Sequence, residues 1–123
     1  MNASLFSLSL DCADASRLAA FWSDLLGRPV DAGATAEFAA IGLADEGASG
    51  LVWMFHQVPE AARGKQVKNR VHPDVVATDR SGAVKKALGL GATSLGEFDE
   101  GGFEWTTLTD PEGNEFDIVA APA

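Results

Sequence analysis

Three aspartates, Asp11, Asp74 and Asp117, are the residues of this 123-residue sequence best placed to do chemistry. Each lies in a predicted strand, and the period of two along a strand directs all three side chains to one inner face of a sheet. Asp117 stands between Phe116 and Ile118, so its charge would be desolvated unless a cation, a hydrogen-bond donor or water in an open pocket receives it. Such carboxylates could act as a general base poised by mutual repulsion or could receive a cationic ligand, and the sequence leaves both uses open.

Aromatic and polar side chains accompany these acids on the inner face. Trp53 and Trp105 offer flat walls for a ligand ring, although a tryptophan in a strand more commonly belongs to the core. For His56 the simplest interpretation is a half-exposed histidine before a turn, and for His72 it is a strand-end histidine satisfied by Asp74 or by the connector. The predicted ligand pocket comprises Ser7, Ser9, Trp53, Met54, Trp105 and Glu115.

The first half of the sequence predicts one strand, one helix and three further strands. Residues 5–12 alternate in polarity, with the apolar positions from Phe6 to Cys12 on the buried side. Asp14 as an N-cap and Gly27 as a C-terminal stop predict a helix over 15–26. Strands are predicted around 28–31, 36–42 and 50–57.

The second half restarts this pattern after a polar connector over 58–69. Residues 72–79 repeat the register of 7–14 with Asp79 as the next cap, which makes Ser7 and His72 equivalent. A second helix ends at 89–91, and strands are predicted near 93–97, 103–109 and 114–120. We therefore predict an α+β fold in which two βαβββ modules, about 1–60 and 70–123, form a concave mixed sheet with the helices outside, in a single domain over 1–123.

Composition limits the partners and the location. Eighteen acidic and nine basic residues give a net charge of −9, which repels phosphate backbones, so we expect no nucleic-acid partner; an acidic excess also serves solubility alone. No apolar run approaches the roughly 18 residues that span a bilayer, and no basic residue precedes the N-terminal apolar residues as in a secretory signal. With Cys12 as the single cysteine, a cytoplasmic protein with no membrane partner is predicted.

Six short segments recur in the order of one known superfamily. They are Leu10-Asp-Cys-Ala-Asp14, Phe21-Trp-Ser-Asp-Leu-Leu-Gly27, Val58-Pro-Glu60, Lys68-Asn-Arg-Val-His72, Gly89-Leu-Gly-Ala-Thr93 and 105–117, the last with the turn Asp110-Pro111-Glu112-Gly113. Together they resemble the vicinal oxygen chelate superfamily of glyoxalase I, bleomycin-resistance proteins, fosfomycin-modifying enzymes and extradiol dioxygenases, and most closely its bacterial glyoxalase-like domains. The resemblance implies the glyoxalase/bleomycin resistance fold.

The resemblance also implies a metal site at the inward ends of four strands. Here the four positions map onto Ser7, the region of His56, His72 and Asp117. Ser7 departs from the pattern, because a serine hydroxyl is a poor ligand for a divalent metal beside histidine or glutamate. Two histidines and Asp117 would still form an open site for Zn, Fe, Mn or Ni, with water completing the shell.

Two functions follow from the resemblance. One is a glyoxalase-like small-molecule enzyme of lyase or isomerase type, in which a metal at His72, Asp117 and His56 polarises vicinal oxygens while one of the inner carboxylates moves a proton. The other is a metal-free protein of the bleomycin-resistance type that sequesters a hydrophobic or cationic compound, as Ser7 and the net charge suggest. Small members of the superfamily commonly pair, so a homodimer is predicted.

Overall fold

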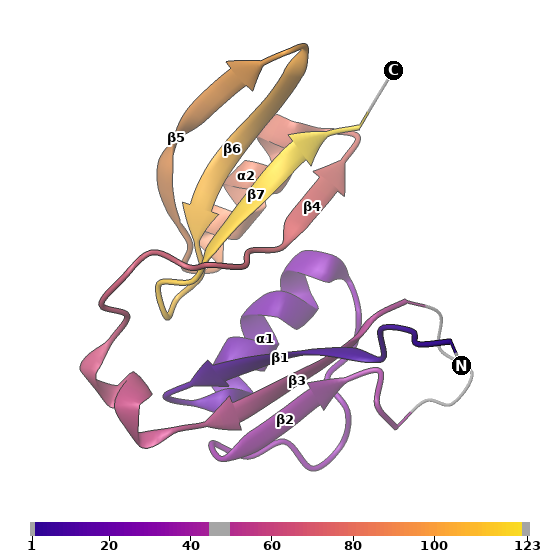
Figure 1. Ribbon diagram of the computed structural model, residues 1–123, viewed down its shortest axis with the longest axis vertical. Coiled ribbons are helices and arrows are strands. Elements are labelled where there is room, and N and C mark those ends of the chain that lie inside the picture. Colours follow the sequence, from indigo (N-terminus) through magenta and orange to yellow (C-terminus); the bar gives the residue numbers. More distant parts are fainter. Residues whose placement is uncertain (1, 45–49, 122–123) are drawn as a thin grey trace. The chain divides into compact units, whose positions relative to one another are not determined.

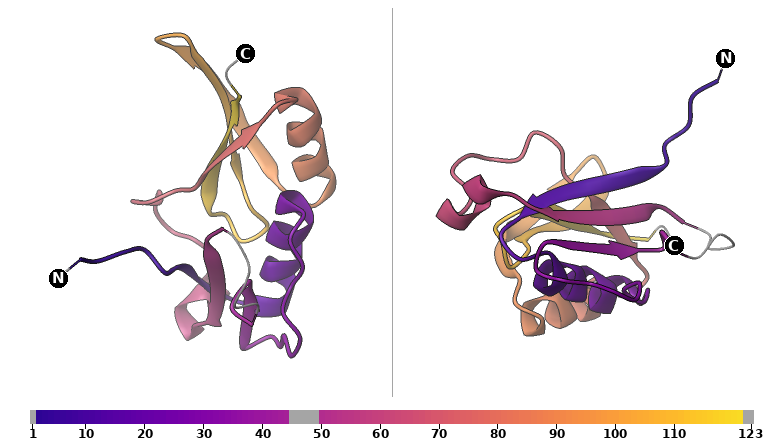
Figure 2. Two further views of the ribbon diagram at one scale, coloured as in Figure 1. Left: turned by 90° about the vertical axis from the view of Figure 1, so that its right-hand side faces the viewer. Right: turned by 90° about the horizontal axis from the view of Figure 1, so that it is seen from below.

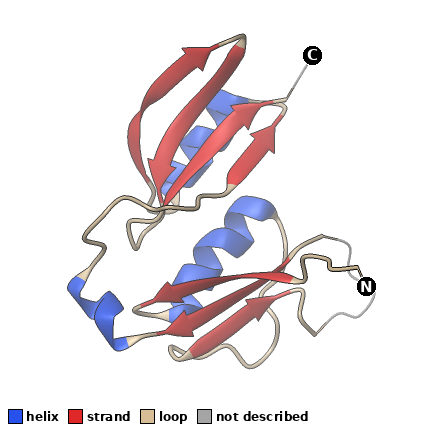
Figure 3. Ribbon diagram, viewed as in Figure 1, coloured by secondary structure: helices blue, strands red, loops and turns tan. Residues whose placement is uncertain are grey.

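The computed structural model describes residues 2–44 and 50–121 and divides into two compact units, Met1–Gly64 and Lys65–Ala123 (Figure 1). Each unit holds one sheet and one α-helix (Figure 3). The α+β fold class and the two-module layout are therefore confirmed. Neither α-helix of the described ranges has the length and apolar character that crossing a membrane requires.

The first unit contains β1 (Ser7–Cys12), α1 (Ala15–Leu26), β2 (Phe38–Ile41) and β3 (Val52–Gln57), followed by the 3₁₀ helix η1 (Pro59–Arg63). β3 lies in the middle of the sheet, parallel to β1 and antiparallel to β2. One face packs on α1, where the ring of Trp22 stacks on Trp53 with centroids 4.8 Å apart. The other face carries the polar positions of β1, as the alternation predicted.

The second unit contains β4 (Asp74–Ala77), α2 (Arg80–Gly89), β5 (Thr93–Glu100), β6 (Phe103–Thr109) and β7 (Glu115–Ala120). The strand order is β4-β7-β6-β5, with β7 parallel to β4 and antiparallel to β6. Leu108, Phe116 and Ile118 are fully buried on the side that α2 covers (Figure 2). We call the opposite side of this sheet the open face.

Both helices begin at the predicted caps. The Asp14 carboxylate accepts a hydrogen bond from the backbone N–H of Arg17 at 3.2 Å, and that of Asp79 accepts one from Gly82 at 3.0 Å. Each carboxylate thus satisfies a backbone donor that the first helical turn leaves unpaired. Gly27 ends α1 in the left-handed conformation, with φ of 68°.

Three local features differ from the sequence predictions. The strand expected around 28–31 is reduced to a single bridge between Val30 and Ile41, next to Pro29, which has no N–H to donate. Phe6 lies before β1 rather than within it and is 63% exposed. β5 extends to Glu100, three residues beyond the predicted end.

Candidate functional site

A row of polar side chains crosses three strands of the open face. In the sheet register, Asp117 of β7 pairs with Asp74 of β4 on one side and with Thr107 of β6 on the other. Directly paired residues place their side chains on the same face of a sheet and close together. The three residues therefore form one continuous polar row.

The next row on the same face is apolar. Val76, Val119, Trp105 and Phe98 follow one another across the four strands. The rings of Phe98 and Trp105 stack with centroids 5.6 Å apart and planes 19° apart. Within the described residues of this unit the only α-helix, α2, lies on the opposite side of the sheet, so the aromatic pair offers a flat surface beside the polar row.

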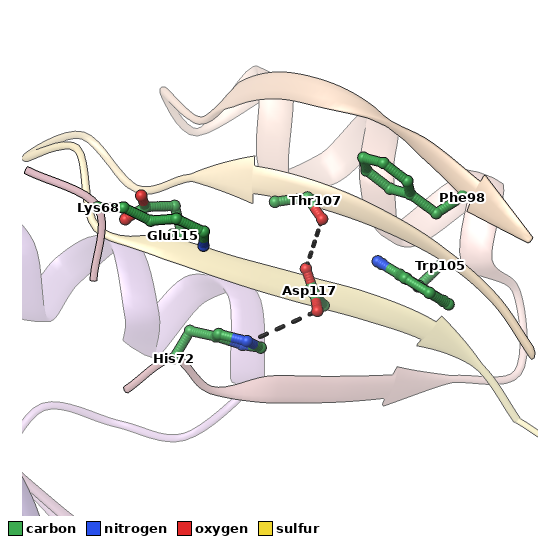
Figure 4. Close-up of a pocket in the computed structure, with 7 residues that line it drawn as sticks. All are labelled: Lys68, His72, Phe98, Trp105, Thr107, Glu115 and Asp117. Atoms are coloured by element: carbon green, nitrogen blue, oxygen red, sulfur yellow. Dashed lines mark hydrogen bonds and ion pairs between the residues drawn. The ribbon is translucent and has the colours of Figure 1, made fainter. Parts of the chain in front are cut away.

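Asp117 is held from two directions (Figure 4). The Thr107 hydroxyl donates a hydrogen bond to Oδ1 of Asp117 at 2.7 Å, and Nδ1 of His72 lies 3.8 Å from Oδ2. The Asp117 side chain is 16% exposed. Thr107 thus supplies the hydrogen-bond donor that a mostly buried carboxylate requires.

His72, Asp74 and Asp117 form a group whose donor atoms lie within 4.8 Å of one another. Nδ1 of His72 is 3.3 Å from Oδ1 of Asp74, whose side chain is 61% exposed. One imidazole nitrogen with one or two carboxylates suits Zn, Mn, Fe or Ni and leaves coordination positions for water or substrate. The donor set therefore fits a divalent metal ion.

Thr107 and Asp117 of the polar row share one pocket of about 260 Å³ with the aromatic pair (Figure 4). Besides Thr107, Asp117 and His72, its lining includes Phe98, Trp105, Lys68 and Glu115. This combination of flat apolar walls with a few convergent polar groups is typical of small-molecule sites.

Glu115 fastens the connector to the sheet. Nζ of Lys65 lies 2.9 Å from Oε2 and 3.1 Å from Oε1 of Glu115, and the backbone N–H of Asn69 also donates to this carboxylate. Burial raises the pKa of Glu115, but the hydrogen bonds from Lys65 and from the backbone of Glu115 and Asn69, with the Lys65 charge, outweigh it and hold the pKa below its usual value. We call Lys65, Asn69 and Glu115 the connector clamp.

The remaining predicted site residues belong to the first unit. Ser7, Ser9 and Asp11 lie on β1, and Met54 and His56 lie on β3, at positions that alternate with the residues packed on α1. The ring of His56 lies against that of Phe38, with centroids 5.2 Å apart. Trp53, by contrast, is 6% exposed and stacks on Trp22, so it is a core residue rather than a pocket wall.

Three residues of the pocket were not predicted from the sequence. Phe98 lies just past the predicted end of its strand, and Lys68 was assigned to the polar connector. Thr107 has no chemical signature of its own. A register count from Asp117 across the turn after 109 would have identified it, because the two residues are cross-strand partners.

Comparison with known proteins agrees with this architecture. A family model described as a glyoxalase-like domain matches residues 7–119. The structure is similar to a glyoxalase/bleomycin resistance protein/dioxygenase family enzyme from Burkholderia phytofirmans PsJN, with 16% identity, a TM-score of 0.77, and coverage of 98% of this chain and 100% of that one. No curated protein matches the sequence.

Two further solved structures have names that state an activity or a ligand. One is a variant of the fosfomycin resistance protein FosX from Listeria monocytogenes, complexed with Mn(II) and 1S,2S-dihydroxypropylphosphonic acid, at 13% identity, TM-score 0.77, and coverage of 99% and 93%. The other is lactoylglutathione lyase from Agrobacterium tumefaciens, at 13% identity, TM-score 0.67, and coverage of 98% and 96%. These likenesses show the fold, and the family match spans nearly the whole sequence. The chain belongs to the glyoxalase-like domain family of the vicinal oxygen chelate superfamily.

Proposed function

We propose that this protein is a metal-dependent glyoxalase-like enzyme of lyase or isomerase type, acting on a small molecule in the pocket of the second unit. The observation that carries the proposal is the group formed by His72, Asp74 and Asp117, with donor atoms within 4.8 Å. His72 and Asp117 of this group line a pocket with aromatic walls. The FosX structure with Mn(II) provides a precedent for a divalent ion in a protein of similar fold.

Each residue of the group has a distinct part in this proposal. His72 and Asp117 hold the ion, and the hydrogen bond from Thr107 fixes the orientation of the Asp117 carboxylate. Asp74, the most exposed of the three side chains, takes the substrate proton as a general base. When bound, a divalent ion supplies Lewis-acid polarisation of adjacent substrate oxygens.

Metal titration tests the proposal directly. Calorimetry of the untagged, metal-free protein with Zn, Mn, Fe and Ni should show one binding event per chain, which His72→Ala removes. Failure of the wild-type protein to bind any of these ions would reject the metal-dependent form. Asp11, predicted as a catalytic carboxylate, and His56, predicted as a metal ligand, belong to the first unit. Substitution of each residue tests whether it contributes to metal binding.

A second function is supported by the aromatic row. Trp105 and Phe98 offer a stacking surface that needs no metal, and Ser7 replaces one ligand of the family pattern. In this alternative the protein sequesters a hydrophobic or cationic compound, as bleomycin-resistance proteins do. A stability screen against cationic antibiotics and aromatic metabolites tests it, because a ligand at 100 times its dissociation constant adds about 2.7 kcal/mol to the free energy of unfolding. If no compound of the panel raised the stability of the protein, the result would count against sequestration.

The proposal includes a homodimer in the cytoplasm. In the described ranges β1, β2, β4 and β5 are edge strands, which leave backbone groups open to pairing with another chain. Sedimentation that showed only a 12.8 kDa species would reject the dimer. The single cysteine, Cys12, is buried and suits a reducing compartment, and cell fractionation tests the location.

A further inference from the structure

A second pocket adjoins the candidate site and takes no part in the chemistry proposed above. Its volume is about 510 Å³, and it shares four lining residues with the first pocket, among them Lys68 and Phe98. Connector residues 65–68 supply one part of its lining, and Leu95 with Phe98 of β5 supplies another. The two pockets therefore form one continuous depression beside the polar row.

The connector part of this lining is fixed to the sheet. Glu115, whose side chain is only 8% exposed, receives hydrogen bonds from Lys65 and from the backbone of Asn69. These contacts hold residues on both sides of Lys68 against the start of β7. A segment anchored at a buried ion pair has fewer conformations than a solvated linker, so the pocket is a built feature of the unit.

Lys68 brings an unpaired positive charge to the place where the pockets meet. Its side chain extends from the connector into the first pocket (Figure 4), and it makes no ion pair in the part of the chain that the structure describes. Glu115, which lines both pockets with it, is already neutralised by Lys65. A ligand anion would supply the partner that Lys68 lacks.

Apolar side chains surround the rest of the second pocket. Val67 is 76% exposed and Leu95 is 56% exposed, and Phe98 is also open to solvent. Exposed apolar residues that gather around a hollow mark a surface that a ligand covers. Asp117 of the polar row would instead attract a cation, but it lies beside His72 in the first pocket and does not line the second.

We propose that the substrate is an amphipathic anion whose apolar group occupies the second pocket and whose anionic oxygen group pairs with Lys68. This inference rests on the proposed function, because it takes the first pocket as the reaction site. It adds the substrate class: a molecule with a ring-sized apolar part and a carboxylate or phosphate-like group, which together place its reacting oxygens at the polar row.

Three probes with one ring and different charges test the proposal. Phenylacetate, phenethyl alcohol and phenethylamine are titrated into the metal-free protein, and the indole N–H signal of Trp105, assigned with Trp105→Phe, reports occupancy by NMR. Phenylacetate should bind at least about tenfold more tightly than phenethylamine, because only the anion gains a charged hydrogen bond. Lys68→Ala should bring the two affinities within about twofold, and Lys68→Arg should retain the preference.

Lys85→Ala is the matched control, because Lys85 is exposed on α2 and its removal changes the net charge equally. It should leave the preference unchanged. Equal or tighter binding of phenethylamine, no binding of phenylacetate, or an unchanged preference in Lys68→Ala would overturn the proposal. Metal titration of the same wild-type sample separates this failure from failure of the proposed function, because it measures the ion site without any organic ligand.

Discussion

In both units the strand before the α-helix pairs in parallel with the strand of its sheet that comes last in the sequence: β1 with β3, and β4 with β7. An aspartate caps the helix in both units. Five residues before those caps stand Ser9 in the first unit and Asp74 in the second. Their partners on the neighbouring strands are Met54 and Asp117. The two units thus share an equivalent row of side chains, which is neutral in the first unit and acidic in the second.

The ionisable pair of the first unit stands one row further along. Asp11 pairs with His56, and the equivalent pair of the second unit is Val76 with Val119. The residue equivalent to Asp117 is therefore Met54, whose thioether is a poor ligand for hard divalent ions. The comparison teaches that the fold supplies equivalent rows, whereas the residues in each row decide whether chemistry is present.

The largest expected effect separates the tryptophans of the two sheets. Trp53→Ala should lower the free energy of unfolding by about 3–5 kcal/mol, because it removes a buried ring and leaves a cavity against Trp22. Trp105→Ala should cost about 1 kcal/mol, since its ring stacks on that of Phe98 on the open face rather than in the core. Chemical denaturation of both variants measures the difference, and equal losses would contradict the assignment of Trp53 to the core.

The next effect contrasts an acid from each unit. Asp117→Asn should weaken metal binding about 100-fold or more, because the amide keeps the shape of the carboxylate but removes its charge. Asp11→Asn should leave the affinity within about twofold, because its row is equivalent to an apolar row of the second unit. Calorimetric titration compares the two variants. A loss of similar size in Asp11→Asn would show that the acidic row of the second unit does not act alone.

The connector clamp should show a pH-dependent contribution to stability. The pKa of Glu115 is lowered in the folded state. The clamp therefore stabilises the fold fully above the unfolded glutamate pKa of about 4.3, and this stabilisation is lost as the pH falls through the folded pKa of Glu115. Glu115→Gln should therefore cost about 1–3 kcal/mol at neutral pH, and the difference from the wild type should shrink below about pH 4.3. Urea denaturation at successive pH values measures this. Glu37→Gln, on the exposed loop before β2, serves as the control, and a difference independent of pH would contradict the clamp.

Local patterns predicted most of the fold, while contacts distant in sequence determined the rest of the site. The predicted helix ends are correct: Asp14 and Asp79 are the N-caps, and Gly27 is the C-cap of α1. Such ends can be predicted because a cap depends on a few neighbouring residues. Lys68 was assigned to the polar connector, because nothing near it in sequence shows that Glu115, buried on β7, holds that segment. Phe98 was missed for a similar reason: β5 continues past 97 only because β6 pairs with it.

A smaller effect is expected from the support of Asp117. Thr107→Val keeps the shape of the side chain but removes the hydroxyl that donates to Oδ1 of Asp117 at 2.7 Å. Metal affinity should fall about tenfold, as is typical when a ligand loses its orienting hydrogen bond. Thr109→Val is the control, because Thr109 lies on the same face of β6 and pairs with Glu115 instead. An unchanged affinity in Thr107→Val would show that Asp117 needs no orienting partner.

The smallest expected effect concerns His56, which the sequence predicted as an additional ligand. Register places His56 two residues beyond Met54, the counterpart of Asp117, and its ring lies against Phe38. His56→Ala should therefore change metal affinity by less than about twofold, whereas loss of a true ligand costs far more than loss of a supporting contact. Metal titration of the His56→Ala and His72→Ala variants under the same conditions compares the contribution of each histidine to metal affinity. A loss in His56→Ala as large as in His72→Ala would show that both units contribute to the ion site and that the rows of the two sheets are not equivalent.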